Sequence, residues 1–206
     1  MRLLHDAGVK NTASVSGEAT PLSLRYSAPQ MYLTILSEVN AENLRRVREA
    51  GSIPGIYGPG KTRFERGFWF WRTGARLCSE EGGVVVYGNP YDPFDGSHNC
   101  DWGDVYPTPD GPAISLHTAE KRAGIDDARY LFQLEELTTE AEKRGSAEAQ
   151  AAVTHARMVV AELERGIEVD FSHYQTVEDE PPGAILDQLR EKVAEEIAEM
   201  QHVLRN

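Results

Sequence analysis

The sequence predicts an α/β fold in which parallel strands alternate with helices, as in a partial (β/α)8 (TIM) barrel, followed by extra C-terminal helices. Three observations support this prediction. Short apolar runs typical of buried strands recur along the first half of the chain, and helical patterns follow them at short spacings. In addition, the chain has 206 residues, whereas a complete barrel usually needs about 250.

The strands and helices of this half barrel follow one another closely. A helix that is capped by Asn40 and ends at Gly51 separates the second strand from the third. Residues 61–77, which place aromatic side chains on one face, predict a helix between the third strand and the fourth. The apolar runs that predict the four strands are residues 9–15, 31–36, 53–57 and 83–88.

Three longer helices are predicted after the last strand, at residues 115–144, 146–165 and 183–204. The third carries an amphipathic stripe, and an acidic segment bounded by prolines precedes it. We expect that last helix to be loosely attached. The sequence therefore divides into a half-barrel domain at residues 1–144 and a helical extension at residues 145–206.

Composition limits the partners of this chain. The net charge is −12, with 33 acidic and 21 basic residues, so we expect no nucleic-acid partner. No apolar run reaches the length of about 18 residues that would indicate a membrane span. Cys78 and Cys100 are more typical of two free or buried thiols than of a disulfide framework. Nothing in the composition predicts a cofactor or identifies a compartment.

Residues 89–113 form the longest stretch without a periodic pattern, and aromatic rings and carboxylates alternate within it. Aromatic rings stack on sugars while carboxylates bind hydroxyl groups, so this mixture favours a carbohydrate site. An acidic surface loop with buried aromatic side chains is the alternative interpretation. Strand ends in a barrel converge on one mouth, and on that basis we predict sugar contacts from Tyr57, Tyr87, Asp92, Trp102 and Asp104.

Three motifs occur in a characteristic order: GFWFWRTGA at residues 67–75, YPTPDGP at 106–112 and RAGIDDARYL at 122–131. In this order they resemble the C-terminal end of the catalytic domain of glycoside hydrolase family 123 and its relatives. The resemblance implies that the chain contributes about strands five to eight of the barrel. It also implies that the substrate is a carbohydrate, such as a β-linked N-acetylhexosamine.

Enzymes of this family use substrate-assisted catalysis, in which an aspartate orients the substrate acetamide and the adjacent glutamate protonates the leaving oxygen. The only Asp-Glu step in this chain, Asp179–Glu180, lies in the proline-flanked linker, where we expect a solvated charge run. By resemblance, the catalytic pair is expected just upstream of Met1. The catalytic residues therefore remain unknown, and we expect this chain alone to be inactive.

The segment near the third motif departs from the family pattern. Relatives carry an arginine and a glutamate two residues apart where this chain has His117 and Ala119, and Glu120 follows immediately. The remaining charged residues of this segment match the family. We predict that they form a structural charge network holding the last barrel helix, made of Arg122, Asp126 and Asp127.

Two other functions compete with the glycosidase interpretation. GIYGPGKT at residues 55–62 matches the P-loop pattern of nucleotide-binding proteins, although Pro54 weakens the strand that would deliver it. A carbohydrate-binding or structural domain without catalysis is the second alternative. His98, Cys100 and Asp101 lie close together but lack the spacing of a calcium loop, so no metal site is predicted. A half barrel has two open sheet edges, from which we expect self-association.

Overall fold

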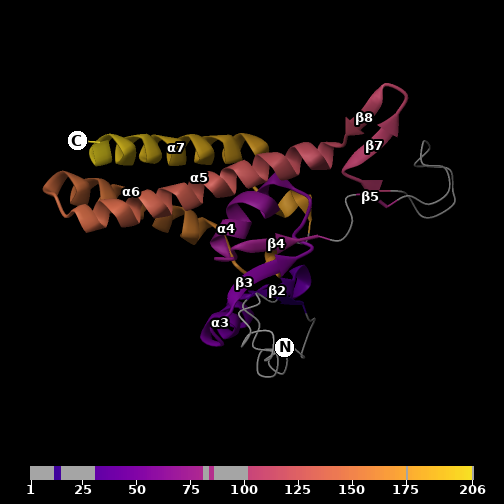
Figure 1. The fold of residues 1–206 in the computed structure, drawn as a ribbon, viewed down its shortest axis with the longest axis horizontal. Helices are drawn as coiled ribbons and strands as arrows, with labels where there is room; N and C mark the ends of the chain where they lie inside the picture. Colours follow the sequence, from indigo (N-terminus) through magenta and orange to yellow (C-terminus); the bar gives the residue numbers. More distant parts are fainter. Residues whose placement is uncertain (1–11, 15–30, 81–83, 86–101, 175, 206) are drawn as a thin grey trace, which may run out of the picture.

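The computed structural model describes five segments of the chain: residues 12–14, 31–80, 84–85, 102–174 and 176–205. Tyr87 and Asp92, two of the predicted sugar contacts, lie outside these segments. The described chain is a mixed α/β structure that is mostly helical (Figure 1). It contains a parallel sheet, two short antiparallel sheets and three long helices.

Four parallel strands form the main sheet, and their order in the sheet follows their order in the chain. They are β1 (Thr12–Ser14), β2 (Met31–Ile35), β3 (Ile53–Tyr57) and β4 (Leu77–Ser79). Every neighbouring pair is parallel, as predicted. The described strands do not close into a barrel. Parallel neighbours end at the same edge of a sheet, so the loops after β3 and β4 begin side by side.

The connection from β2 to β3 has the predicted form. A 3-10 turn, η2 (Leu36–Glu38), leads into α3 (Ala41–Glu49), and the Asn40 side chain accepts a hydrogen bond of 2.9 Å from the backbone of the first helical turn. Leu44 and Val47 are buried on the inner face of this helix. Capping and periodicity therefore placed this helix correctly.

The helix between β3 and β4 is shorter than the predicted range of 61–77. It contains a π-helical turn, η3 (Glu65–Trp69), which continues into α4 (Phe70–Arg72). Gly74 then takes a left-handed conformation, with φ of 69°. Because glycine adopts this conformation at little cost, the chain turns back toward the sheet a few residues earlier than predicted.

The predicted fourth strand at residues 83–88 is wrong as a member of the main sheet. That place is taken by β4, which pairs with β3. Within the predicted range, β5 (Val84–Val85) instead pairs antiparallel with β6 (Trp102–Gly103). An apolar run predicts a strand but does not identify its partner, which is why the sequence pattern misassigned this segment.

Regular structure is also found in the described part of the stretch predicted to be irregular at residues 89–113. β7 (Val105–Thr108) and β8 (Gly111–Ile114) form an antiparallel hairpin. A Pro-Asp dipeptide makes the turn, and the glycine that follows it has φ of 117°. Proline, aspartate and glycine in this order favour a tight turn. The prediction of an irregular loop was therefore wrong for this part.

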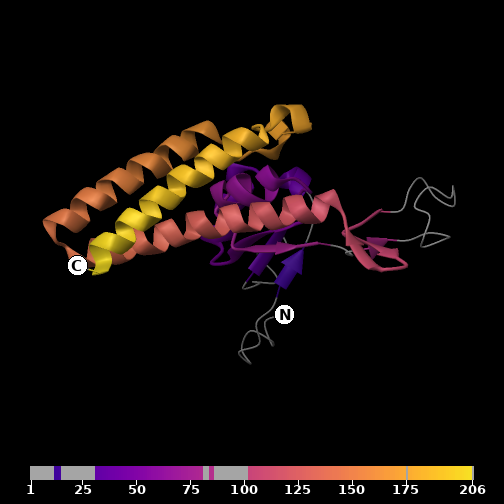
Figure 2. The same ribbon diagram turned by 90° about the horizontal axis from the view of Figure 1, so that it is seen from above.

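Three long helices follow at almost the predicted positions, and Figures 1 and 2 show them packed side by side as an elongated bundle. They are α5 (Leu116–Arg144), α6 (Ala147–Gly166) and α7 (Gly183–Arg205). Gly145, with φ of 71°, ends α5, and the Ser146 hydroxyl caps α6. A left-handed glycine followed by a serine cap makes a tight reversal between antiparallel helices.

The terminal helix is firmly packed, contrary to the loose attachment predicted from the linker. The linker itself packs on the core. The ring of Phe171 lies edge-on to that of Trp69, with 5.3 Å between the ring centroids, and the ring of Tyr174 lies edge-on to that of Phe64, with 4.8 Å between the centroids. Two 3-10 turns form in this linker: η4 (Phe171–Tyr174) and η5 (Val177–Asp179). The buried stripe of α7 is Leu186, Val193, Ile197, Met200 and Val203.

A single hydrophobic core runs from the helices beside the sheet into the bundle. Its largest fully buried side chains include Phe64, Phe68 and Trp69, which lie in or next to η3, and Leu131 and Leu134, which lie in α5. The helix α5 belongs to both parts, because it packs against η3 as well as against α6 and α7. It therefore fixes the end of the sheet relative to the bundle.

Candidate functional site

The carboxyl ends of β3 and β4 bring two polar residues to one edge of the sheet. Tyr57, the last residue of β3, is in register with Ser79, the last residue of β4. The backbone N–H of Gly58 donates a hydrogen bond of 2.7 Å to the Ser79 carbonyl, which holds the two exits together. Glu80 follows directly after β4. Tyr57 and Glu80 therefore begin the two neighbouring loops.

Four charged side chains gather at this edge, and we name them the strand-end charge cluster: Arg66, Glu80, Asp104 and Lys121. The Glu80 carboxylate accepts a hydrogen bond of 2.5 Å from the Arg66 guanidinium and another from the Lys121 ammonium. Lys121 donates to Asp104 at 2.6 Å as well. The two cations are almost completely buried, whereas the side chains of Glu80 and Asp104 each remain 27% exposed. The carboxylates are thus the part of the cluster that solvent or a ligand can reach.

Two glycines allow the helices that carry the cluster to cross closely. A Cβ atom on Gly124 of α5 would lie 2.5 Å from the Arg63 carbonyl oxygen and 2.6 Å from the Arg66 Cβ. A Cβ atom on Gly67 of η3 would lie 2.9 Å from the Asp127 Cβ. These distances are too short for any side chain, so glycine at both positions is required for the crossing. The crossing is what brings Lys121 of α5 within reach of Glu80.

A second ion-pair network lies at the same helix crossing, around Asp127, whose side chain is fully buried. Its carboxylate accepts from Arg63 at 2.7 Å and from the Arg190 guanidinium of α7. Arg63 also reaches Asp187 at 2.6 Å. The hydrogen bond with Asp127 is the main reason why the pKa of Arg63 is raised. This network ties the start of η3, the middle of α5 and the start of α7 together.

The other two residues predicted for a structural network lie elsewhere. Asp126 pairs at the surface with Arg129 at 3.2 Å, and the Arg122 side chain is exposed. Adjacent positions on a helix point in directions about 100° apart, so only one of the two neighbouring aspartates can face the crossing. The structure therefore brings Asp127 alone of these three into the buried network.

The P-loop-like segment leads into a helix whose first backbone N–H groups are near a carboxylate of the chain itself, that of Glu65. The backbone N–H of Glu65 donates to the Thr62 hydroxyl at 3.2 Å, and the backbone N–H of Thr62 donates to the Glu65 carboxylate at 2.9 Å. This reciprocal pair is a capping box. The carboxylate also lies against Gly60, where a Cβ atom would be 1.8 Å from it.

This geometry disfavours nucleotide binding. A P-loop holds phosphate on the free backbone N–H groups of a helix start. Here the Glu65 carboxylate takes the place of the phosphate, so an incoming phosphate would meet a negative charge. In addition, β3 runs from Ile53 to Tyr57 and so includes the first glycine of the motif, which shortens the loop that would have to form the cradle.

A groove of about 580 Å³ lies beside this helix start, between the loop after β3, the first turns of α5 and the linker before α7. Its walls combine apolar and charged side chains. The loop contributes Lys61, Thr62, Arg63 and Phe64, and α5 contributes Leu116, His117 and Glu120; the linker and α7 contribute Glu178, Glu180, Pro181, Pro182, Gly183 and Leu186. Such a mixture of apolar walls and a few polar groups is typical of small-molecule sites.

Glu180 is the residue of this groove whose acidity differs most from that of an ordinary carboxyl group. Burial raises the pKa of Glu180 to about 7, although a hydrogen bond with Thr62 opposes the rise. The nearby carboxylates of Glu65 and Glu120 raise the pKa further. The Asp179–Glu180 step was predicted to be a solvated charge run. Asp179 is indeed exposed, but Glu180 is half-buried and can carry a proton near neutral pH.

The five predicted sugar contacts have different positions. Tyr57 and Asp104 lie at the end of the sheet, the latter within the strand-end charge cluster. Trp102 belongs to β6, where its backbone pairs with Val85. Tyr87 and Asp92 lie outside the described residues.

Sequence reasoning did not identify Glu80, Arg66, Lys121 or Glu180. A strand end placed at residue 79 would have pointed to Glu80. Arg66 and Lys121 become partners of Glu80 only through the fold, and no local pattern marks them. Glu180 was visible in the sequence as part of the Asp-Glu step, but its burial depends on the fold.

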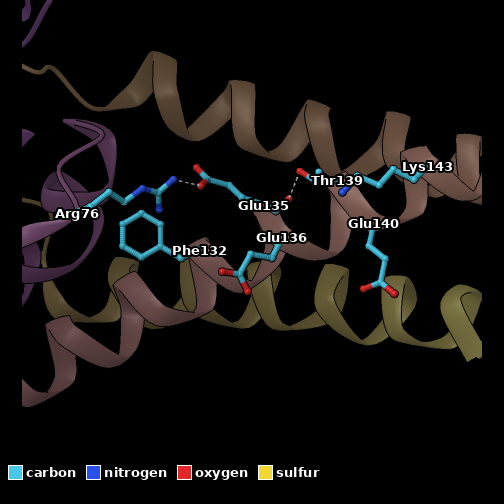
Figure 3. A pocket seen from close by; sticks show the side chains of 7 residues that line it. All are labelled: Arg76, Phe132, Glu135, Glu136, Thr139, Glu140 and Lys143. Carbon is cyan, nitrogen blue, oxygen red and sulfur yellow. Dashed lines mark hydrogen bonds and ion pairs between the residues drawn. The ribbon is translucent and has the colours of Figure 1, made fainter. Parts of the chain in front are cut away.

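A further groove, of about 660 Å³, lies on the outer face of α5 (Figure 3). Arg76 pairs with Glu135 at 3.0 Å and lies over the Phe132 ring at 4.2 Å. The second Glu135 oxygen accepts from the Trp71 indole at 2.8 Å. These contacts fasten α4 and the residues after it to α5. Because its central charges are already paired, this groove is better explained by packing between helices than by ligand binding.

The described residues contain no group of three or more His, Cys, Asp or Glu side chains that could hold a metal ion. Nor is any of the described helices long and apolar enough to cross a membrane. Comparison of the chain with protein-family models, with curated proteins and with solved structures gave no match. The resemblance to glycoside hydrolase family 123 therefore depends on the three motifs alone.

Proposed function

We propose that this chain provides half of a (β/α)8 glycosidase-like domain, and that it binds a carbohydrate at the carboxyl ends of its parallel strands. One observation carries the proposal. Four parallel strands follow one another in the sheet in chain order, and polar side chains gather where β3 and β4 end. This strand order is that of a (β/α)8 barrel, in which ligands bind at the same end.

The chemistry of this end suits a sugar. The partly exposed carboxylates of Glu80 and Asp104 can accept hydrogen bonds from hydroxyl groups, and the buried cations behind them hold them in place. Tyr57 adds a half-buried ring with a polar tip beside them. A ring together with two fixed carboxylates offers both the stacking surface and the acceptors that a sugar uses.

For hydrolysis, we propose that the Asp-Glu acid pair comes from the complementary half of the barrel. Asp179 does not act in the groove as the orienting aspartate would, because it is exposed and accepts hydrogen bonds from Thr176 at 2.9 and 3.1 Å. The chain thus supplies binding groups, and β-linked N-acetylhexosamine remains the substrate class that the motif resemblance implies. Binding without turnover is expected from the chain alone.

Titration calorimetry with a disaccharide containing β-linked N-acetylgalactosamine tests this proposal. We expect Asp104→Asn and Tyr57→Ala each to weaken binding about tenfold, the effect of losing one hydrogen bond to a charged group or one ring contact. Tyr130→Ala is the matched control, since this tyrosine is exposed on α5 and lies outside the strand-end charge cluster. Thermal unfolding establishes that each variant is folded. An equal loss of affinity in all three variants, or no binding by the unmodified chain at millimolar sugar, would refute the proposal.

A further inference from the structure

The groove beside the start of α5, between the loop after β3 and the linker before α7, is separate from the proposed carbohydrate site. Its volume is about 580 Å³, and no residue of the strand-end charge cluster lines it. On α5, Glu120 lines the groove, whereas its neighbour Lys121 belongs to the cluster. Adjacent helical positions point about 100° apart, so these two side chains meet different surroundings. The groove can therefore hold a ligand of its own.

The groove has an apolar lining that is only partly covered. Its apolar side chains come from all three walls: Phe64, Leu116, Pro181, Pro182 and Leu186. Phe64 and Leu186 are buried in the core, but Leu116 is 75% exposed. A ligand with an apolar body would remove Leu116 from water, and this burial would favour binding.

The charge of the groove selects among ligands of this kind. The carboxylates of Glu65 and Glu120 lie close enough to that of Glu180 to oppose its ionisation. All three accept hydrogen bonds from neutral groups. The backbone N–H of Thr62 donates to Glu65 at 2.9 Å, and the backbone N–H of Arg63 donates to Glu120 at 3.1 Å. The partner of Glu180 is the Thr62 side chain. Neutral partners do not offset three neighbouring negative charges, so a cation placed among them would be attracted by all three.

Positive charge from the chain itself is directed elsewhere. The Arg63 guanidinium, which lines the groove, pairs with Asp127 and Asp187. None of the ion pairs between described residues involves the three carboxylates. Two exposed side chains of the groove can also carry positive charge: Lys61 and His117. The ion pairing within the described residues thus leaves the three carboxylates for a cation of the ligand.

We propose that this groove binds a small arylalkylamine, that is, a protonated primary amine carried on an aromatic ring. Its ammonium group donates hydrogen bonds to Glu120 and Glu180, and its ring lies against Leu116. An ammonium group has three donors, so two carboxylates can share it. The same carboxylates would repel an anion, and a neutral ligand would leave their charge uncompensated. The inference goes beyond carbohydrate binding, and because the two sites use different residues, each can fail without the other.

Three probes of one shape test the preference for a cation on the full chain: phenethylamine, phenethyl alcohol and phenylpropionate. Titration calorimetry at pH 8, where most of Glu180 is ionised, should show about tenfold tighter binding of the amine than of the alcohol, the effect of a hydrogen bond between charged groups. Phenylpropionate should bind most weakly. Equal affinities of the amine and the alcohol would overturn the proposal, as would the absence of amine binding at millimolar concentration.

Substitutions place the amine in the groove. Glu180→Gln should weaken binding of the amine about tenfold and leave that of the alcohol unchanged. Glu199→Gln, at an exposed carboxyl group of α7 outside the groove, is the control for the loss of one charge. Leu116→Ala should weaken both probes several-fold, whereas Met158→Ala, at a side chain of α6 that is 57% exposed, should weaken neither. Thermal unfolding establishes that each variant is folded. If Glu180→Gln behaved like Glu199→Gln, or Leu116→Ala like Met158→Ala, the amine would bind elsewhere and the proposal would be wrong.

The pH dependence of amine binding gives a further test. Affinity should fall as the pH decreases from 8 to 5.5, because Glu180, whose pKa is about 7, takes up a proton, while an alkylamine with a pKa of about 10 stays charged. Protonation of His117 acts in the same direction, so the comparison is with Glu180→Gln, which should lose much of the dependence. The other charged groups that face Glu180 from the three walls are Lys61, Arg63, Glu65, Glu120 and Glu178. An identical pH dependence in the variant and the unmodified chain would contradict the proposed contact.

Discussion

The first half of α5, residues 116–130, meets η3 and the start of α7 through glycine and buried charge, whereas the second half, residues 131–144, contributes leucine and alanine to the core of the bundle. In the first half, Gly124 allows the crossing and Asp127 joins three elements by ion pairs. In the second half, Leu131, Leu134 and Ala141 are at most 1% exposed.

The comparison separates two ways of holding one helix. Apolar packing tolerates small shifts, because it depends on filled volume rather than on direction. A buried carboxylate with two arginines requires fixed positions, and it becomes costly as soon as one partner is lost. The half with the demanding geometry is also the half that carries Lys121 to the strand-end charge cluster. The most precisely positioned half of α5 is thus the half that contributes Lys121 to the candidate site.

The largest expected effect is that of Asp127→Ala. This change leaves Arg63 and Arg190 partly buried without their shared carboxylate, and it should lower the free energy of unfolding by about 3–5 kcal/mol. Urea denaturation measures the loss. Asp126→Ala is the matched control, since its ion pair is exposed and contributes only about 0–1 kcal/mol. If the two variants were equally stable, the buried network would not hold this half of the helix.

In the second half of α5, Leu134→Ala should cost about 3 kcal/mol, because it leaves a cavity in the bundle. The Leu134 side chain is completely buried between the helices. Leu116→Ala, at a leucine of the same helix that is 75% exposed, should change stability by less than about 0.5 kcal/mol. Urea denaturation of both variants checks the contrast. A loss below that of the exposed control would show that the bundle half is loosely packed.

At the crossing itself, Gly124→Ala should destabilise the protein by about 1–3 kcal/mol, since the added methyl group meets the Arg63 backbone. This outcome opposes helix propensity, which favours alanine over glycine by about 1 kcal/mol. Gly166→Ala is the control, because no atom lies within 4 Å of the Cβ position there. Thermal unfolding of the two variants gives the comparison. Stabilisation by both changes would mean that the helices do not cross as closely as described.

The sequence could predict the elements that local signals determine, but not those that depend on contacts between distant residues. The bounds of α5, α6 and α7 follow from the serine caps at Ser115 and Ser146 and from the apolar period, both of which are local signals. The position of β4 does not follow from such signals. A three-residue strand has too few side chains to show a period. The fourth strand was therefore predicted in the more apolar run that follows β4 and contains β5.

Charged partners were the least predictable part of the candidate site. Arg190 lies 63 positions from Asp127, and Lys121 lies 41 positions from Glu80. No spacing rule connects residues that far apart, because their meeting depends on how the helices cross. Gly124 was visible in the sequence as part of a motif, yet its role needed the position of η3. Sequence patterns therefore located the long helices, while the ion pairs between the elements required the fold.

The smallest effect concerns Glu180 in the groove at the start of α5. Because its pKa is raised from 4.5 to about 7, the folded state favours the protonated form. The stability that this preference contributes is fully present below about pH 4.5 and is lost as the pH rises through about 7. The side chain is only half-buried, so after solvent screening the change should be on the order of 1 kcal/mol.

Glu180→Gln removes the titration and keeps the shape of the side chain. The variant and the unmodified chain should be similarly stable at pH 5, and the variant should be the more stable one at pH 8. Unfolding temperatures measured across this range test the expectation, with Glu178→Gln, an exposed carboxyl group on the same groove, as the control for loss of one charge. A difference between Glu180→Gln and the unmodified chain that does not vary with pH would show that Glu180 is ionised throughout. The groove would then lack a proton donor near neutral pH.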